Sequence, residues 1–509
     1  MLSVYGWLLE AIHSTVQIPH TFHVQMKNSN SPNPLYLGSI VLVAVIGGLL
    51  FGYDTAVISG AEKGLQAFFQ GASDFNYTDA VHGFTTSSAL IGCIIGAFLS
   101  GLMASKLGRK KSLFIAGILF FLSALGSFAP EFLFFEKNVP TLGLLVAFNL
   151  YRVLGGIGVG LASALCPMYI AEVAPANKRG MLVSWNQFAI IFGQLVVYFV
   201  NFLIVHAHAN DPAIVEWTTK VGWRMMFVSE CVPAGLFALL ILLVPETPRY
   251  LVLSGQDDKA LGVLTKINGL GKAKEILSEI KATTVEKTEK IFAYGFIVVF
   301  IGCMLSVFQQ AIGINAVLYF APRIFESMGV SNNMLFTVIM GVINITFTLV
   351  AVFTVEKLGR KPLLITGSLG MALGALGVAL SNVVAGMPAV IPVISIMLYS
   401  ACFMFSWGPI CWVYISELFP NTIRSQATAI AVAFQWIFNF IVSSTFVPMY
   451  NMKLGAMGDS FGHFFAYALY GVICIIAAIF VWKLVPETKG KTLEDMTKLW
   501  RDRQAKKKA

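Results

Sequence analysis

Long runs of apolar residues divide this sequence, and very few charged residues interrupt them. One example is SIVLVAVIGGLLFGY at 39–53. A run of about 20 such residues is long enough to cross the hydrocarbon core of a bilayer as an α-helix. Only 12% of the 509 residues are Asp, Glu, Lys or Arg, well below the share in an ordinary soluble domain. So few charges cannot cover the surface of a soluble protein of this length. A soluble enzyme is therefore excluded, and a polytopic membrane protein is indicated.

Twelve apolar stretches have the length of a membrane span. They do not alternate between apolar and polar residues as the strands of a membrane barrel do, so we predict that all are helices. The expected spans are 36–60, 83–105, 112–129, 142–170, 181–206, 225–245, 291–321, 333–355, 363–382, 388–416, 426–450 and 462–485. The predicted fold class is an all-α membrane protein with twelve transmembrane helices.

The basic residues orient these spans. Of 35 Lys and Arg residues, only Arg152 lies well inside a predicted span. When the connections after even-numbered spans are placed on one side with the C-terminus, that side collects 27 cations and the other side six. The positive-inside rule makes the cation-rich side cytoplasmic. We expect a multi-pass protein of the plasma membrane, embedded in the lipid bilayer, with both termini in the cytoplasm. The net charge of +9 then reflects topology and requires no nucleic-acid partner.

Three motifs recur in the same order in the two halves of the chain. The pairs are KLGRKKSL (106–113) with KLGRKPLL (357–364), YIAEVAPANKRG (169–180) with YISELFPNTIRS (414–425), and VPETPR (244–249) with VPETKG (485–490). Three matches at nearly one offset indicate duplication of a six-helix unit. Repeated halves are typical of secondary transporters, which bind their substrate near the bilayer midplane between the repeats.

The polar segment 249–290 separates six predicted spans from the other six, and its amphipathic pattern predicts short helices at the cytoplasmic surface. The expected regions are a tail (1–35), an N-terminal bundle (36–248), a helical linker (249–290), a C-terminal bundle (291–486) and a cytoplasmic tail (487–509). Residues 1–25 lack the basic and long apolar segments of a signal peptide. Met26 precedes a natural short tail, so translation from Met26 is an alternative.

Several classes of chemistry have no support in the sequence. There is no phosphate-binding loop for ATP-driven transport, and the seven cysteines are scattered singly, without a metal-binding or disulfide pattern. We therefore expect no metal, no cofactor and no enzymatic activity. The glycines of GGIGVGLAS (155–163) are interpreted as positions where helices approach closely. Transport must then use an ion gradient or run downhill.

Three charged residues lie within the predicted spans. Asp54 follows a long uncharged run, and a carboxylate at that depth usually faces a cavity and is paired. We interpret it as a proton-coupling group with Arg152 as its partner, since a change in pairing can load and release a proton. The alternatives are an Asp54 that positions a helix break and an Arg152 that reaches the interface or clamps two helices. Glu230 is a second embedded acid, for which a structural hydrogen bond remains an equal alternative.

Amide and aromatic residues in otherwise apolar spans are the candidates for substrate binding. Hydroxyl groups need both donors and acceptors, which Gln and Asn supply together. A single buried amide also commonly joins two helices, but the number of these residues favours a neutral polyhydroxyl ligand. The candidates are Gln187, Gln194, Gln309, Gln310, Asn315, Tyr319, Asn344, Trp407, Gly408, Trp412, Gln435 and Trp436.

Charged residues at matched helix ends on the cytoplasmic side form a candidate gate. Opposite charges there can pair when that side closes and part when it opens; the alternative is that they only set topology. The candidate gate residues are Arg109, Glu172, Arg179, Glu246 and Arg249 in the first half, and Arg360, Glu417, Arg424 and Glu487 in the second.

The motifs resemble those of the sugar porters of the major facilitator superfamily from about residue 38 to 495. They are LGRKK, LGRKP, Arg152 before GGIGVG, PMYIAEVAPANKRG, PETPR, QQAIGIN, GPICW and PETKGKTLED. The segments FGYDTAVISG, SALIGCIIGA, NQFAIIFGQ and AVAFQW are similar to the bacterial D-xylose:proton symporter branch in particular.

This resemblance implies two six-helix bundles, four cytoplasmic helices and alternating access, in a monomer of a bacterial inner membrane. It implies that Asp54 couples the proton with Arg152, that Glu230 modulates this pair, and that Phe51 lines the sugar cavity with the residues above. Facilitative glucose carriers of the family typically have Asn at the position of Asp54, which favours symport of D-xylose or a related monosaccharide with a proton. A facilitative hexose or pentose uniporter and a transporter-like sugar sensor are the alternatives.

Overall fold

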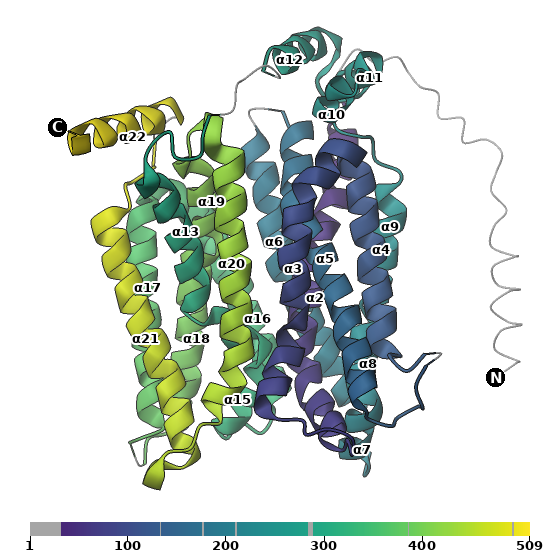
Figure 1. Ribbon diagram of the computed structural model, residues 1–509, viewed down its shortest axis with the longest axis vertical. Helices are drawn as coiled ribbons and strands as arrows, with labels where there is room; N and C mark the ends of the chain where they lie inside the picture. The colour runs from purple at the N-terminus through teal and green to yellow at the C-terminus, as the bar shows by residue number, and fades with distance from the viewer. Residues whose placement is uncertain are drawn as a thin grey trace, which may run out of the picture.

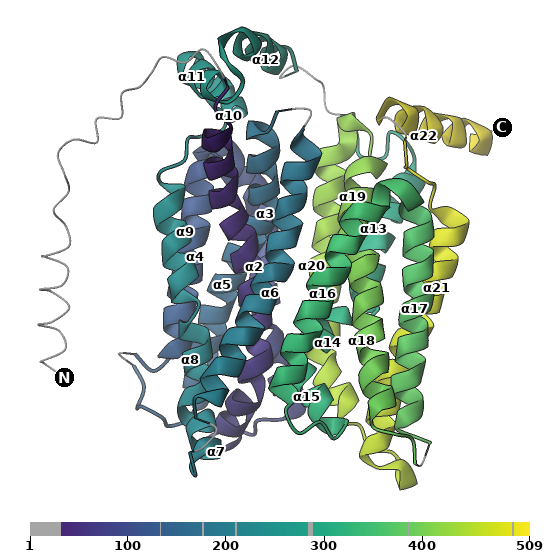
Figure 2. The ribbon, with the colours of Figure 1, turned by 180° about the vertical axis from the view of Figure 1, so that it is seen from behind.

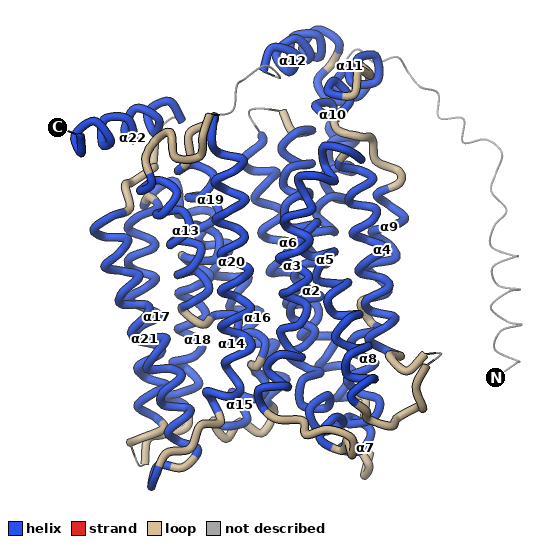
Figure 3. The backbone as a smooth tube through the Cα atoms, in the orientation of Figure 1, coloured by secondary structure: helices blue, strands red, loops and turns tan. Residues whose placement is uncertain are grey.

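The computed structural model describes residues 32–132, 134–175, 178–208, 211–283, 289–384, 386–490 and 493–508. Residues 1–25 and the alternative start at Met26 lie outside the described residues. The part of the chain that the structure describes consists of two groups of long helices side by side (Figures 1 and 2) and contains no β-strand (Figure 3).

The first bundle contains six spans, of which the sixth is made of short pieces. These are α2 (Pro34–Gln70), α3 (Asp79–Leu107), α4 (Arg109–Phe128), α5 (Leu142–Val173), α6 (Arg179–His206), and α7 (Ile214–Trp217) with a π-helical turn (Thr218–Gly222), α8 (Trp223–Val228) and α9 (Cys231–Ile241). Within this bundle α3 and α4 pack on α5, and α2 packs on α6.

The second bundle repeats this plan with two broken spans. Its helices are α13 (Phe296–Ala311) with α14 (Ile314–Tyr319), then α15 (Ala321–Ser327), α16 (Asn333–Leu358), α17 (Arg360–Ser381), α18 (Val390–Phe405) with α19 (Trp407–Leu418), α20 (Asn421–Tyr450) and α21 (Asp459–Leu484). Twelve helices of the described chain are long and apolar enough to cross a membrane. The predicted fold class is thus confirmed, and the protein is a multi-pass membrane protein.

Four further helices lie at one end of the two bundles, which we term the linker end. They are α10 (Pro248–Leu253), α11 (Asp257–Asn268), α12 (Leu270–Thr283) and α22 (Leu493–Lys508). The opposite end, where α7 and α15 lie, is termed the loop end (Figure 1). Between the bundles, α3 packs against α20 and α6 packs against α16.

Helix α2 is longer than the predicted span 36–60. It begins where the Asn33 side chain accepts a hydrogen bond from the Tyr36 N–H at 3.1 Å, with Pro34 in the first turn, and such residues are typical of helix starts. It continues to Gln70, because no proline or other strong turn signal occurs before Gly71. Asp54 therefore lies near the middle of a continuous helix, and α2 has no break at Asp54.

Three spans predicted as continuous are broken: the sixth, between α8 and α9, and two in the second bundle. Gly313, between α13 and α14, has φ of +86°, a left-handed conformation that glycine adopts without strain. The Tyr399 hydroxyl donates to the carbonyl oxygen of Ile312, so the break has a partner for a freed backbone group. Between α18 and α19 the break falls at Ser406, whose hydroxyl donates to the Cys402 carbonyl at 2.6 Å. Irregular backbone at membrane depth is tolerated where it is buried in protein.

The glycines of α5 allow it to approach α3 closely, as interpreted from the sequence. A Cβ atom on Gly156 would overlap the backbone oxygen of Ala89, and one on Gly160 would overlap the backbone oxygen of Cys93. Backbone atoms of a packed helix cannot move aside as a flexible side chain can.

Gly156→Ala is expected to lower the free energy of unfolding by about 3 kcal/mol, since overpacking typically costs this much in a close-packed interior. Thermal unfolding of the purified protein in detergent measures the effect. Gly101→Ala on α3 is the matched control, because nothing lies within 4 Å of the added Cβ, and it should leave the stability unchanged or slightly raised. Equal stability of the two variants would contradict the interpretation of Gly156 as a packing residue.

Candidate functional site

A buried ion pair joins α2 and α5 in the first bundle. The Nη1 atom of Arg152 lies 2.7 Å from Oδ1 of Asp54, and Nη2 donates to the backbone oxygen of Asp54 at 3.2 Å. The two residues are almost fully buried, with 2% and 0% of their surface exposed. The guanidinium also lies over the ring of Phe227, 5.0 Å from its centroid. Oδ2 of Asp54 has no hydrogen-bond partner among the described residues.

Glu230 adds a second carboxylate to this site. It is fully buried, and neither of its side-chain oxygens has a hydrogen-bond partner among the described residues. Asp54 and Arg152 both lie within electrostatic range of it. The preceding residue, Ser229, bonds to the hydroxyl of Tyr53 on α2 at 2.7 Å. The site thus gathers two acids and one cation where water is largely excluded.

The broken spans of the second bundle position a group of polar side chains. Nε2 of Gln309 donates to the backbone oxygens of Trp407 and Gly408, at 3.0 and 3.2 Å, just after the Ser406 break. These bonds fix the amide and leave its buried Oε1 without a partner among the described residues. Across the Gly313 break, Nδ2 of Asn315 donates to Oε1 of Gln310 at 2.5 Å. A hydroxyl-bearing ligand could donate to Oε1 of Gln309.

An aromatic contact joins the two bundles near the ion pair. The rings of Phe51 on α2 and Trp436 on α20 are 5.6 Å apart between centroids. Trp436 Nε1 and the neighbouring Gln435 Oε1 are buried without partners among the described residues. Phe51 also precedes Asp54 by less than one helical turn. The structure therefore brings part of the predicted sugar set close to the predicted proton site.

The remaining sugar candidates differ in their surroundings. Tyr319 is buried on α14 and lies within electrostatic range of Asp54 and Arg152. Asn344 accepts a hydrogen bond at Oδ1 from the Ser400 hydroxyl at 2.6 Å, which joins α16 to α18. Gln187 on α6 and Trp412 on α19 are half-buried. Asn344 thus has a structural partner.

The candidate gate residues form the same arrangement in each half at the linker end. Arg109 pairs with Glu172 at 2.7 Å, and Arg360 pairs with Glu417 at 2.8 Å. In both halves a glutamate accepts from the first two backbone N–H groups of the helix that the arginine begins. These glutamates are Glu246 and Glu487. In this structure the pairs lie within each bundle, and a role in closing the linker end stays a prediction.

The remaining three gate candidates are more peripheral. Arg179 and Arg249 are exposed. Arg424 is half-buried, and its Nε donates to the backbone oxygen of Phe419 at 3.4 Å. This contact lies within the second bundle.

The two helix-capping glutamates differ in their ionisation. Burial raises the pKa of Glu246, although the backbone N–H groups of Thr247, Lys110 and Arg109 oppose it. Burial acts in the same direction on Glu487, but four backbone N–H donors outweigh it and lower its pKa. Hydrogen bonds to the charged form of a carboxyl favour that form. The two halves are therefore similar in geometry but unequal in electrostatics.

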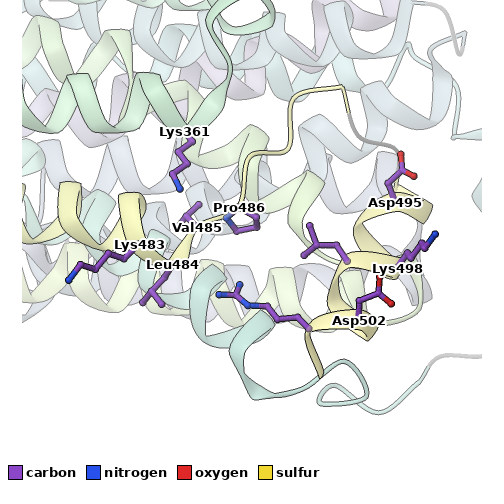
Figure 4. Close-up of a pocket in the computed structure, with 10 residues that line it drawn as sticks. Lys361, Lys483, Leu484, Val485, Pro486, Asp495, Lys498 and Asp502 are labelled. Atoms are coloured by element: carbon purple, nitrogen blue, oxygen red, sulfur yellow. The ribbon is translucent and has the colours of Figure 1, made fainter. Parts of the chain in front are cut away.

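A cavity of about 620 Å³ opens at the linker end (Figure 4). Four cations and two acids contribute to its lining, together with four other residues. They are Lys361, Lys483, Leu484, Val485, Pro486, Asp495, Lys498, Leu499, Asp502 and Arg503. None of the sugar candidates lines it, so we do not place the substrate there. Among the described residues, no group of three or more His, Cys, Asp or Glu side chains could hold a metal ion.

Sequence reasoning missed a second buried charge group, at the loop end. His82 and Arg323 both bond there to the carboxylate of Glu62. Arg323 follows the predicted span 291–321 and is one of the six cations on the side opposite the cation-rich one, where the sequence predicts no partner for it. The sequence carries no clear signal for this group, because Glu62 follows the predicted span 36–60 by two residues and His82 directly precedes the predicted span 83–105. Charged and polar residues are ordinary at such span ends.

Two similar six-span bundles around buried charges and amide groups have the architecture of a secondary transporter. Residues 40–500 match the family model described as sugar (and other) transporter, and the chain belongs to that family. The relatives and the solved structure compared below are sugar transporters, and the chain is a membrane transporter of this family rather than an enzyme.

Three comparisons define the relationship. The chain is 49% identical over 483 residues to the D-xylose-proton symporter of Escherichia coli K12, covering 92% of this chain and 96% of the relative. It is 37% identical to the glucose facilitated diffusion protein of Zymomonas mobilis, covering 91% and 97%. The partially occluded inward-open structure of the xylose transporter XylE from E. coli superposes with a TM-score of 0.80 at 47% identity, covering 90% and 100%.

Proposed function

We propose that this protein carries D-xylose, or a closely related monosaccharide, into the cell together with a proton by alternating access. The observation that carries the proposal is the buried group of Asp54, Arg152 and Glu230 within a chain similar to a D-xylose-proton symporter. In this proposal Asp54 takes up the proton and Arg152 is its counter-charge. Glu230 contributes a second negative charge, which sets the net charge of the group.

Charge balance supports one proton per cycle. Two carboxylates and one guanidinium carry a net charge of −1 when all are ionised, and one bound proton makes the group neutral. A net charge in a low-dielectric site is costly. The group with one bound proton is neutral, so it is favoured while the site is closed, before it opens to the cytoplasm. Protonation of Asp54 would also weaken its attraction to Arg152, which frees the helices α2 and α5 to move.

The sugar would bind beside this group, between the bundles. The proposed ligand-binding residues are Gln187, Gln309, Gln310, Asn315, Trp412, Gln435 and Trp436, with Phe51, Tyr319, Asn344 and Gly408 lining the cavity. Unpartnered amide oxygens at Gln309 and Gln435 support this assignment, because sugar hydroxyls donate to such oxygens. Aromatic faces such as that of Trp436 can cover the C–H face of a sugar ring.

The proposed organisation follows from topology. The bundles 36–248 and 291–486 would act as two rigid halves, joined by the linker 249–290 and followed by the tail 487–509. The linker end would face the cytoplasm with both termini, and the membrane would be a bacterial inner membrane. We propose that the monomer is the working unit and that Arg109–Glu172, Arg360–Glu417 and their neighbours gate the cytoplasmic side.

Sugar-induced proton movement tests the proposal. Addition of D-xylose to de-energised cells that produce the protein should raise the external pH, because each sugar enters with a proton. L-xylose, the mirror image of D-xylose with the same polarity, serves as the control and should give no signal. Uptake of xylose without any change in external pH would contradict proton coupling.

Facilitated diffusion is the second candidate function, because the chain is also 37% identical to a glucose facilitated diffusion protein. In that case Asp54 would have a structural role, and the protein would carry D-glucose down its concentration gradient. Competition of labelled xylose uptake by glucose, arabinose and galactose in proteoliposomes identifies the preferred sugar under either candidate.

A further inference from the structure

A buried charged contact crosses between the two bundles at the loop end. Arg323 on α15 donates from Nε to Oε1 of Glu62 at 3.1 Å and from Nη2 to Oε2 at 2.6 Å. Nη2 also donates to Oε1 of Gln66, one turn further along α2. Glu62 is fully buried, and the Arg323 side chain is 14% exposed. A two-pronged arginine–carboxylate contact is among the strongest charge-assisted hydrogen-bond arrangements.

The first bundle holds the Glu62 carboxylate in place. His82 on α3 is also fully buried, and its Nε2 lies 3.0 Å from Oε2 of Glu62. Its Nδ1 lies 3.0 Å from the Tyr77 hydroxyl. Since the ionised carboxylate can only accept, Nε2 carries the hydrogen and Tyr77 donates to Nδ1 when the histidine is neutral. His82 is thus a positioning residue that orients Glu62 toward the opposite bundle.

Further polar contacts surround this one. Asp79 on α3 accepts from Gln66 at 3.4 Å and from Asn451, which follows α20 in the second bundle, at 2.9 Å. Lys63 on α2 pairs with Glu326 on α15 nearer the surface, where the side chains are 37% and 57% exposed. We name the buried set of Glu62, Gln66, His82 and Arg323 the loop-end clasp. The clasp shares no residue with the proposed sugar or proton site.

The position of the clasp complements the pairs at the linker end. There the pairs Arg109–Glu172 and Arg360–Glu417 lie within single bundles, so separation of the bundles leaves them intact. The pairs Glu62–Arg323 and Lys63–Glu326 each join one bundle to the other. Any motion that opens the loop end must therefore break them.

We propose that the loop-end clasp is an ionic lock that holds this side of the transporter closed and sets the balance between the closed and open loop end. This inference rests on the proposed alternating access. In the closed state Glu62 neutralises Arg323 away from water. Opening hydrates both charges while His82 keeps its bond to Glu62. Removing only one partner leaves the other charge buried and uncompensated in the closed state alone, so single substitutions favour opening.

Distances between spin labels at the loop end test the lock in the full-length protein. Labels on Val215→Cys and Ser331→Cys report the two bundles, because both positions are exposed at this end. The parent chain without these substitutions gives the background from the native cysteines. Glu62→Gln and Arg323→Gln are each expected to raise the ratio of long-distance to short-distance populations at least tenfold. Unchanged distance distributions in both variants would overturn the proposal.

Matched variants separate the lock from general damage. Lys63→Gln and Glu326→Gln remove charge from the exposed pair at the same interface, and surface pairs contribute little, so each should change the ratio less than twofold. Arg323→Lys keeps the charge but loses the two-pronged geometry and should give an intermediate shift. His82→Leu should raise the ratio of long-distance to short-distance populations. His82→Gln keeps a hydrogen-bond donor and should give the same ratio as the parent chain. If Arg323→Lys opens the loop end as fully as Arg323→Gln, the two-pronged geometry is irrelevant and the proposal is contradicted. The proposal is also contradicted if Lys63→Gln or Glu326→Gln opens the loop end as much as Glu62→Gln.

The readout is independent of the transported sugar and of proton coupling. If sugar uptake proves not to move protons while Glu62→Gln still opens the loop end, the proposed symport fails and the lock stands. If symport is demonstrated but the single variants keep the parent distances, the lock fails and the proposed function stands.

Discussion

Asp54→Asn is expected to abolish uphill accumulation of the sugar while leaving binding and exchange intact. Asparagine has nearly the same shape as aspartate but carries no exchangeable charge at this position. Arg152 would lose its ionic partner at 2.7 Å, and an unpaired buried cation ordinarily costs several kcal/mol. Glu230 lies within electrostatic range and can balance that charge. The variant should therefore fold and cycle, but with no proton step coupled to the sugar step.

The expected effect is large because the membrane potential alone is a strong driving force. One charge moving through 100 mV gains about 2.3 kcal/mol, which supports a sugar gradient of roughly fifty-fold. In membrane vesicles with an imposed proton gradient, the accumulation ratio of labelled xylose should fall to about one in Asp54→Asn. Counterflow of labelled against unlabelled xylose, measured without a gradient, should remain.

Asp74→Asn provides the matched control, because Asp74 is exposed in the connection between α2 and α3 and accepts from the Leu142 N–H. That variant should accumulate sugar like the parent chain. If Asp54→Asn still accumulates xylose in a pH-dependent manner, Asp54 is not the proton carrier. Loss of counterflow together with accumulation would instead indicate that the residue is structural.

The twelve spans could be predicted from the sequence because hydropathy and membrane thickness act locally. The breaks at Gly313 and Ser406 could not. Glycine or proline lies at or beside each break, but neither is a sufficient signal, since Pro167 and Pro448 lie inside continuous helices of this chain. The broken backbone at Ile312 has its hydrogen-bond partner in Tyr399, from a different helix. Such tertiary partners leave no trace in local periodicity, and the same breaks carry the candidate residues Gln309, Gln310 and Asn315.

The candidate sites divide in the same way. Asp54 and Arg152 could be paired from the sequence because each is conspicuous in an apolar span. The contact between Glu62 and Arg323 could not, because 261 residues separate the two and each lies beside a predicted span end, where a charge needs no explanation. The positive-inside rule assigns Lys and Arg residues to one side of the membrane but does not predict which residues they pair with. Burial and pairing at span ends are properties of the packed structure.

Gln309→Ala is expected to weaken sugar binding about 10- to 100-fold. Its amide nitrogen is anchored to two backbone oxygens, and its buried Oε1 is directed by these bonds but has no protein partner among the described residues. A sugar hydroxyl that donates to this oxygen would be left unpaired in the variant, which typically costs about 1–3 kcal/mol. Titration of tryptophan fluorescence or equilibrium dialysis with labelled xylose measures the affinity.

Asn201→Ala separates ligand binding from helix packing, because the two amides are bonded alike. Nδ2 of Asn201 on α6 donates to the backbone oxygen of Val57 at 3.3 Å, and its buried Oδ1 also has no partner among the described residues. Asn201 is outside the proposed sugar set, so its loss should lower thermal stability to a similar extent without changing the affinity for xylose. If both variants bind xylose as tightly as the parent chain, Gln309 joins helices and the sugar is bound by other groups. If both lose affinity equally, the effect arises from packing, and only selective loss in Gln309→Ala places the amide against the sugar.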